Sequence, residues 1–151
     1  MTNLHHEIVI NTPVEKVWKV LADLESVCFY NVTVKSARYA SSNKEGKGAS
    51  RYCELLPKGY VKEQVTEWEE NRVLAIELIE HQWPVAFMRW RTELQPKGDA
   101  TFVTQNLEYE TKFGIFGKFL NILIMRKKLD QTLTQVFKDL KRYIETGAKR
   151  T

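Results

Sequence analysis

The residues best able to do acid–base or metal chemistry are few and scattered along the chain. The histidines are His5, His6 and His81, and the first two are adjacent, so in a strand they point to opposite faces. None has the spacing of a base with its nucleophile. The two cysteines, Cys28 and Cys53, belong to no CxxC or Cys/His pattern, and no glycine-rich loop of the dinucleotide or P-loop kind is present. The sequence therefore predicts no catalytic residue, no metal site and no cofactor.

A binding chemistry is indicated instead by two stretches in which side chains alternate between the faces of a strand. The faces of interest carry Met88, Trp90, Thr92 and Leu94 in one stretch, and Val103, Gln105, Leu107 and Tyr109 in the next. Apolar faces with one or two hydroxyl or amide groups suit a site for a mostly apolar ligand. Core and pocket faces share this alternation, so a plain hydrophobic core remains the other interpretation.

Arg126 interrupts a long helical apolar pattern between Ile122 and Leu129. An unpaired charge on a buried face is costly. Either the side chain extends to the rim with its stem buried, or it reaches into a pocket and meets an anionic or carbonyl group of a ligand.

The elements that must position these side chains follow from periodicity and turn signals. A first strand covers residues 5–11. Thr12 then caps a helix with Pro13 at its first position, and a shorter helical turn follows at residues 26–30. From residue 32 the period changes from helical to strand-like, and the strand candidates are 32–41, 49–56, 60–69, 72–80, 86–95 and 100–110. Strands in series with short turns indicate an antiparallel meander.

The last element is a helix from about Ile115 to Thr146, ended by Gly147. Its apolar stripe contains Ile115, Phe119, Ile122, Leu129, Leu133, Val136, Leu140 and Tyr143. About 30 residues at ~1.5 Å each give a rod of roughly 45 Å, which must cross the whole sheet. The sequence thus predicts one α+β domain over residues 1–151. In it, a curved antiparallel sheet of about seven strands wraps a long C-terminal helix, and two short helices follow the first strand.

Charge is distributed unevenly along the chain. The net charge is +4, but residues 111–151 hold 10 Lys/Arg and 3 Asp/Glu, a net +7, whereas residues 1–110 hold 13 and 16, a net −3. Basic residues are not clearly interleaved with exposed aromatics, so no nucleic-acid partner is expected. No apolar stretch of about 18 residues and no signal-peptide region is visible. We expect a cytoplasmic protein, at most peripheral to a membrane.

The first turns of the last helix are apolar on nearly every side, far beyond one stripe. The partner could be a second subunit, a lid over a pocket, the interface of an anionic membrane, or simply the strand loops. The residues expected to make this contact are Phe116, Phe119, Leu120, Arg126, Lys127 and Lys128. The glycines Gly114 and Gly117 would let this end hinge.

Five short motifs occur in order along the chain. They are Ile8 to Glu25 (Ile-x-Ile-x-Thr-Pro-x-Glu-x-Val-Trp), Gly46-x-Gly48, Glu67 to Leu74, Gly98-x-x-Thr101-x-Val103, and Gly114 to Gly117. Together they resemble the START-related superfamily of helix-grip proteins (SRPBCC) and its polyketide cyclase/dehydrase and lipid-transport branch. The resemblance covers nearly the whole chain. It departs at Cys28-Phe29-Tyr30, where the family often has a Trp.

The resemblance implies a pocket between the sheet and the last helix, but no single chemistry. The expected lining residues are Met88, Trp90, Thr92, Gln105, Leu107, Tyr109, Ile122, Met125 and Arg126. The leading hypothesis is binding or transport of a hydrophobic or aromatic small molecule, such as a lipid, a quinone or a polyketide-like compound. One alternative is an aromatase/cyclase-like enzyme in which Arg126, Tyr109, Gln105 and Thr92 are the candidate proton shuttles. Another is a quinone- or membrane-associated accessory protein.

Overall fold

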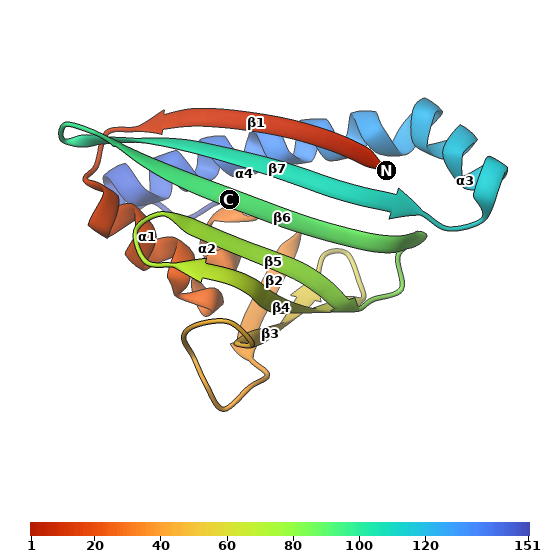
Figure 1. Cartoon of the computed structure of the whole chain (residues 1–151), viewed down its shortest axis with the longest axis horizontal. Coiled ribbons are helices and arrows are strands. Elements are labelled where there is room, and N and C mark those ends of the chain that lie inside the picture. Colours follow the sequence, from red (N-terminus) through yellow and green to blue (C-terminus); the bar gives the residue numbers. More distant parts are fainter.

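The computed structural model describes all 151 residues and contains a seven-stranded antiparallel sheet with a long C-terminal helical segment across it (Figure 1). The strands are β1 (Thr2–Ile10), β2 (Val34–Tyr39), β3 (Ser50–Leu55), β4 (Tyr60–Glu69), β5 (Val73–Glu80), β6 (Val85–Lys97) and β7 (Ala100–Thr111). Their order is β1-β7-β6-β5-β4-β3-β2, and every neighbouring pair is antiparallel. The predicted α+β fold is confirmed, including the meander from β2 to β7.

The helices fall into two groups along the chain. Between β1 and β2 lie α1 (Val14–Ala22), the 3-10 turn η1 (Leu24–Ser26) and α2 (Val27–Tyr30). After β7 come α3 (Gly114–Leu120), the π-helical segment η2 (Asn121–Met125) and α4 (Arg126–Thr146). No helix is both long enough and apolar enough to cross a membrane.

The start of α1 differs from the prediction. Pro13 occupies the N-cap position and no side chain caps the helix. The carbonyl oxygen of Thr12 instead accepts a hydrogen bond from the Thr101 hydroxyl at 2.7 Å. Thr12 therefore ties the end of β1 to β7 rather than closing the helix.

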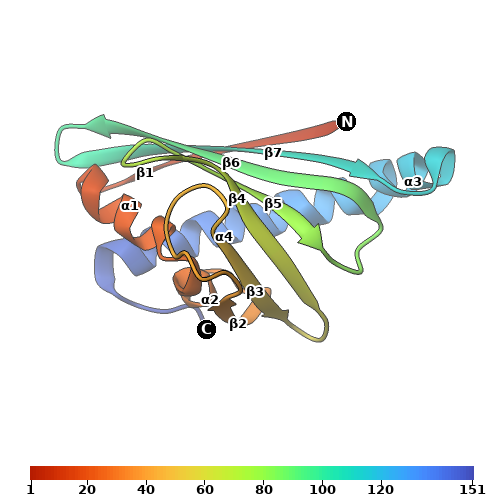
Figure 2. The same cartoon turned by 60° about the horizontal axis from the view of Figure 1, so that its bottom comes forward.

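The core lies where the sheet curves around α4 (Figure 2). Strands β6 and β7 turn alternate residues inward, as the period of two predicts, and Met88, Val103 and Leu107 are completely buried. From the helix side, the buried hydrophobic residues are Leu133, Val136, Phe137 and Leu140. Their spacing of three and four residues places them on one face of α4, toward the sheet.

The apolar stripe of the last helix does not face the sheet over its full length. Its second half is buried as predicted, but Ile115, Phe119 and Ile122 are largely exposed. The reason is geometric, because α3 lies past the ends of the strands (Figure 1) and η2 buries only Asn121, which bonds to Tyr109 of β7 and Thr2 of β1. The predicted apolar stripe is therefore covered by the sheet only after Met125, and its first turns do not pack against the sheet.

Candidate ligand-binding cavity

A cavity of about 90 Å³ lies under α4, between the helix and the concave face of the sheet. The sheet contributes Leu74 and Ile76 from β5 and Trp90 from β6. Helices close the other side with Leu21 of α1, Val27 and Tyr30 of α2, and Leu133, Val136, Phe137 and Leu140 of α4. Ten of its 15 lining residues are hydrophobic, so the space favours an apolar occupant.

An ion pair forms one polar part of the cavity wall. The Nε atom of Arg51 on β3 lies 2.5 Å from the Glu63 carboxylate on β4, and the two are direct cross-strand partners. About a tenth of each side chain is exposed. The Nη1 atom of Arg51 also donates to the Leu24 carbonyl oxygen at 3.3 Å. Two of the five guanidinium N–H groups are thus used, and the others can donate to a ligand.

The ion pair keeps its charge although it is buried. Burial by itself would lower the pKa of Arg51, but its interactions with Glu63, Cys53 and Tyr30 together outweigh burial, and the net shift is upward. Breaking such a pair leaves an uncompensated buried charge, which is strongly destabilising. The Arg51–Glu63 pair in the cavity wall is therefore needed for a stable fold.

Two further groups beside the ion pair remain protonated at neutral pH. Burial raises the pKa of the Tyr30 phenol, which lines the cavity, to about 12. Burial also raises the pKa of the Cys53 thiol to about 12. A thiol with so high a pKa is a poor nucleophile. Cys53 therefore acts as a small core residue here.

A second polar part of the wall lies on the other side of β5. The side-chain amide of Gln105 on β7 donates to the Thr92 hydroxyl on β6 at 2.9 Å, and both residues line the cavity. This bond leaves the Gln105 carbonyl oxygen and the Thr92 hydroxyl proton available. The cavity thus has two polar pairs with an apolar stretch, Leu74 and Ile76, between them, and Asn31 is its fifth polar lining residue.

The structure brings together only part of the predicted pocket. Trp90, Thr92 and Gln105 line the cavity. Met88, Leu107 and Tyr109 are completely buried further along the same face, in packed core. Met125 is partly buried against that core, whereas Ile122 and Arg126 are exposed. Of the four candidate proton shuttles, Arg126 does not reach the cavity, and the Tyr109 hydroxyl is engaged with Asn121.

Arg51 and Glu63 are lining residues that sequence reasoning missed. A signal was present, because Arg51 shares a strand face with Cys53, and Glu63 lies between Val61 and Val65 on an otherwise apolar face. A charge at a core-facing position is unusual. Two such charges of opposite sign on consecutive strands suggest a cross-strand pair.

The wall near α2 is fastened by Arg150. Its backbone N–H donates to the Phe29 carbonyl oxygen at 2.8 Å, and its guanidinium donates to the carbonyl oxygens of Cys28 at 3.1 Å and Val34 at 2.6 Å. Tyr143 of α4 also packs against the rings of Phe29 and Tyr30. Movement of α2 relative to α4 requires these contacts to break.

A larger hollow of about 590 Å³ lies outside the core, between α1, the β2–β3 loop and the β4–β5 turn. Only four of its 11 lining residues are hydrophobic, and Glu15, Asp23, Glu45 and Glu70 stand on its walls. It is a solvated surface groove, so we assign the candidate site to the smaller cavity under α4.

Comparison with known proteins identifies the family of this chain. The family model described as polyketide cyclase / dehydrase and lipid transport matches residues 1–145. This chain belongs to that family. The match confirms the resemblance read from the motifs, over almost the full length. Among curated proteins, no significant match is found.

Solved structures from other organisms have the same fold as this family member. A protein from Thermus thermophilus is 22% identical, with a TM-score of 0.80 over 98% of this chain and 100% of its own. A START superfamily protein from Mycobacterium smegmatis is 16% identical, with a TM-score of 0.79 over 97% and 99%. A norcoclaurine synthase point mutant from Thalictrum flavum, solved with a transition-state analogue, is 15% identical, with a TM-score of 0.72 over 97% and 95%. At these identities the likeness establishes the helix-grip fold alone.

Proposed function

We propose that this chain binds a hydrophobic or aromatic small molecule in the cavity between the sheet and α4. The observation that carries the proposal is the cavity's lining, in which ten of 15 residues are hydrophobic and four of the five polar ones form two pairs, Arg51–Glu63 and Thr92–Gln105. Membership of a family whose description includes lipid transport supports a ligand of this class.

The two polar pairs, Arg51–Glu63 and Thr92–Gln105, indicate which polar groups the ligand carries. Free N–H groups of Arg51 favour a carbonyl, hydroxyl or carboxylate oxygen at one end. Glu63 already compensates the charge of Arg51, so a neutral oxygen is sufficient there. At the other end, Thr92 and Gln105 offer both a donor and an acceptor. A lipid, quinone or polyketide-like compound has this arrangement of an apolar body with oxygen atoms.

The size of the cavity means that such a ligand enters by moving a wall. A volume of about 90 Å³ holds about three water molecules at ~30 Å³ each. Pockets for drug-sized ligands measure roughly 300–1,000 Å³. We infer that α2 moves, because it is a helix of only four residues, and Arg150 and the aromatic contacts to Tyr143 are among the few contacts that hold it.

The proposal is tested by filling the cavity. Val136→Phe places a larger side chain into the space from α4. It should weaken binding of the apolar dye phenylnaphthylamine by about tenfold or more, since little free volume remains. Dye binding is followed by fluorescence titration, and thermal unfolding verifies that the variant is folded. Mass spectrometry of an organic extract of the purified protein identifies any ligand that accompanies it.

A matched control distinguishes dye binding in the cavity from dye binding at the surface. Ile79→Phe adds the same side chain at an exposed position of β5 and should leave dye affinity unchanged. Because exposed apolar side chains of α3 can also bind such dyes, both variants are made with Phe116→Ser and Phe119→Ser. Equal dye affinity in Val136→Phe and Ile79→Phe would show that the dye does not bind under α4, and the proposal would fail.

A further inference from the structure

Residues 113–124, here called the apolar tip, expose large hydrophobic side chains on most of their surface. Eight of them are each more than half exposed: Phe113, Ile115, Phe116, Phe119, Leu120, Ile122, Leu123 and Ile124. Ile115 and Phe116 exceed 80% exposure. Contiguous patches of this kind are uncommon on monomeric proteins and mark sites of interaction.

The tip turns one small and one polar residue inward, the reverse of an ordinary amphipathic helix. Only Gly117 and Asn121 are buried in α3 and η2. A Cβ atom at Gly117 would overlap the carbonyl oxygen of Lys112, so only glycine allows this close approach. The backbone thus rests on the β7–α3 turn at a position with no side chain.

Asn121 fixes the tip in this orientation. Its side-chain oxygen accepts a hydrogen bond from the buried Tyr109 hydroxyl, and its amide donates to the Thr2 hydroxyl at 2.9 Å. These bonds join η2 to β7 and β1, and they direct the remaining faces of the helix outward. The exposure of the apolar side chains therefore follows from specific contacts.

Positive charge surrounds the tip. Lys112, Lys118, Arg126, Lys127 and Lys128 lie within or beside it, and no acidic residue occurs between residues 111 and 129. Each of the five is exposed, and none takes part in a salt bridge. A partner that neutralises this charge must be anionic over an area, and each Lys or Arg near an anionic lipid surface adds about 1 kcal/mol of attraction.

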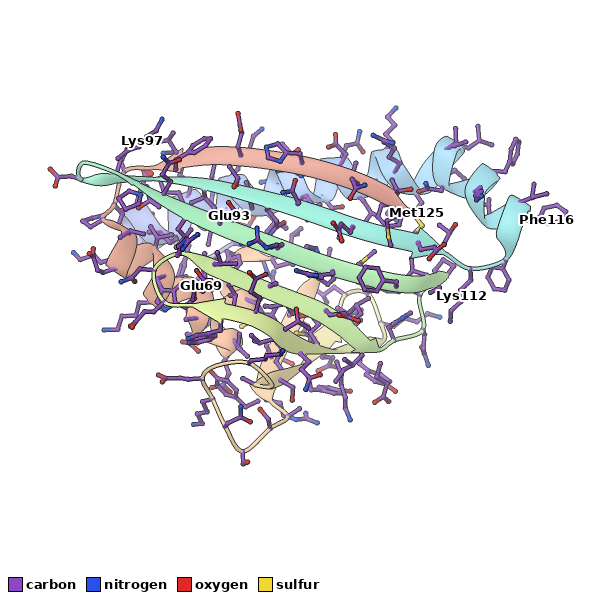
Figure 3. All side chains as sticks on the ribbon, in the orientation of Figure 1. Glu69, Glu93, Lys97, Lys112, Phe116 and Met125 are labelled. Atoms are coloured by element: carbon purple, nitrogen blue, oxygen red, sulfur yellow. The ribbon has the colours of Figure 1, made fainter.

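The position of the tip excludes a role as a lid on the cavity. Figure 3 shows Phe116 and Lys112 at the end of the molecule opposite Lys97. None of its residues lines the cavity. A symmetric dimer through the tips would bring two uncompensated groups of five positive charges together, and like charges across an interface are costly.

We propose that the apolar tip inserts into the interface of an anionic lipid membrane, with Arg126, Lys127 and Lys128 at the level of the phosphate groups. The helix lies in the interface and does not span it, in agreement with the lack of a membrane-crossing helix. This contact is independent of what the cavity under α4 binds.

The proposal is tested by co-sedimentation of the full chain with vesicles. One set is pure phosphatidylcholine and the other contains about one third phosphatidylglycerol. We expect binding to the anionic vesicles at low salt, weak binding to the neutral ones, and release as salt is raised, because salt screens the attraction. Lack of binding to anionic vesicles at low salt would overturn the proposal.

Two pairs of variants separate the apolar contribution from the charge. Phe116→Ser/Phe119→Ser should weaken binding about tenfold or more, whereas Val9→Ser/Ile79→Ser, which alters two exposed apolar residues of the sheet, should not. Replacing Arg126, Lys127 and Lys128 by Gln should weaken binding by up to about a hundredfold at low salt. The control replaces the exposed Lys16, Lys47 and Lys58 by Gln, which gives the same net charge.

Equal losses in the tip variants and their controls would mean that general charge and hydrophobicity govern binding, and the proposed contact would be wrong. Analytical ultracentrifugation tests the competing partner. A concentration-dependent dimer that disappears in Phe116→Ser/Phe119→Ser would replace the membrane by a second copy of the chain. Neither result would affect dye binding under α4, so this proposal and the proposed function can fail separately.

Discussion

The apolar tip and α4 belong to one helical segment from Gly114 to Thr146, yet α4 buries its large apolar side chains whereas the tip exposes them. In α4, Leu133, Val136, Phe137 and Leu140 face the sheet and are buried. In the tip, Gly117 and Asn121 face the protein and the large apolar residues face outward. The comparison shows that hydrophobicity alone does not place a residue in a core. An apolar side chain needs a surface to pack against, and the sheet supplies one to α4 only.

The largest difference between the halves should appear when the same substitution is made in each. Leu140→Ala removes a side chain that is 2% exposed and should lower the free energy of unfolding by about 3 kcal/mol, through lost burial and the cavity left behind. Leu123→Ala removes one that is 58% exposed and should change it by less than about 0.5 kcal/mol. Urea-induced unfolding of both variants measures the effects. Similar losses would show that the tip packs against this chain in solution.

The region under α4 should also respond to alkaline pH. Tyr30 and Cys53 have ordinary pKa values of 10.0 and 9.0, and burial raises both to about 12 in the folded chain. Folding therefore favours their protonated forms. This stabilisation is complete below pH 9 and is lost as the pH rises toward 12, because the unfolded chain then ionises more readily.

We expect the free energy of unfolding to fall by about 2 kcal/mol or more between pH 9 and pH 11.5. Urea unfolding across this range measures it. Tyr30→Phe serves as the control, since it removes one of the two ionising groups and should make the decline shallower. A decline of the same slope in Tyr30→Phe would show that its phenol is not held protonated under α4.

A smaller and more local effect should follow from loosening the tip. Asn121→Ala leaves the buried Tyr109 hydroxyl without its acceptor, which should cost about 1–2 kcal/mol. Amide exchange of residues 114–125 should accelerate, while residues 133–140 should stay protected. Adding Tyr109→Phe to this variant should cost little more, because the unpaired hydroxyl is then gone. Faster exchange in both halves would mean that the tip and α4 unfold together.

The smallest expected effect concerns the solvent accessibility of single side chains, measured by thiol labelling. With Cys28→Ser as background, Ile124→Cys introduces a thiol where the native side chain is 60% exposed. It should react with a thiol reagent within the mixing time at pH 8. The native Cys53, completely buried and with a raised pKa, should react only when the protein opens. Equal reaction rates of the two thiols would contradict the difference in exposure between the tip and the core under α4.

Much of the fold could be predicted from the sequence because local patterns determine it. Alternation in residues 86–95 and 100–110, with turn residues between them, indicated the β6–β7 hairpin. The same alternation correctly grouped Met88 with Trp90 and Gln105 with Leu107 on inward faces. The apolar character of the tip was also visible, because a helix with large hydrophobic residues on every side cannot bury them all.

The candidate site was less predictable because it depends on packing between distant elements. Alternation shows which residues face inward, but it does not show where side chains leave space. Trp90 lines the cavity whereas Met88, two residues away, is in solid core. The Arg51–Glu63 pair depends on the register of β3 with β4, which the sequence does not give. How much of the last helical segment stays uncovered depends on where the sheet ends relative to the helix.

The hydrogen bonds of Arg150 link the residues after α4 to the segment around α2. They join Arg150 to the carbonyl groups of Cys28 and Val34, which are 122 and 116 positions away in the chain. Detachment of residues 147–151 and displacement of α2 are therefore coupled. The rate at which a ligand is exchanged would then be limited by detachment of residues 147–151. Arg150→Ala would therefore change how fast the protein loads its ligand while leaving the residues that line the cavity untouched.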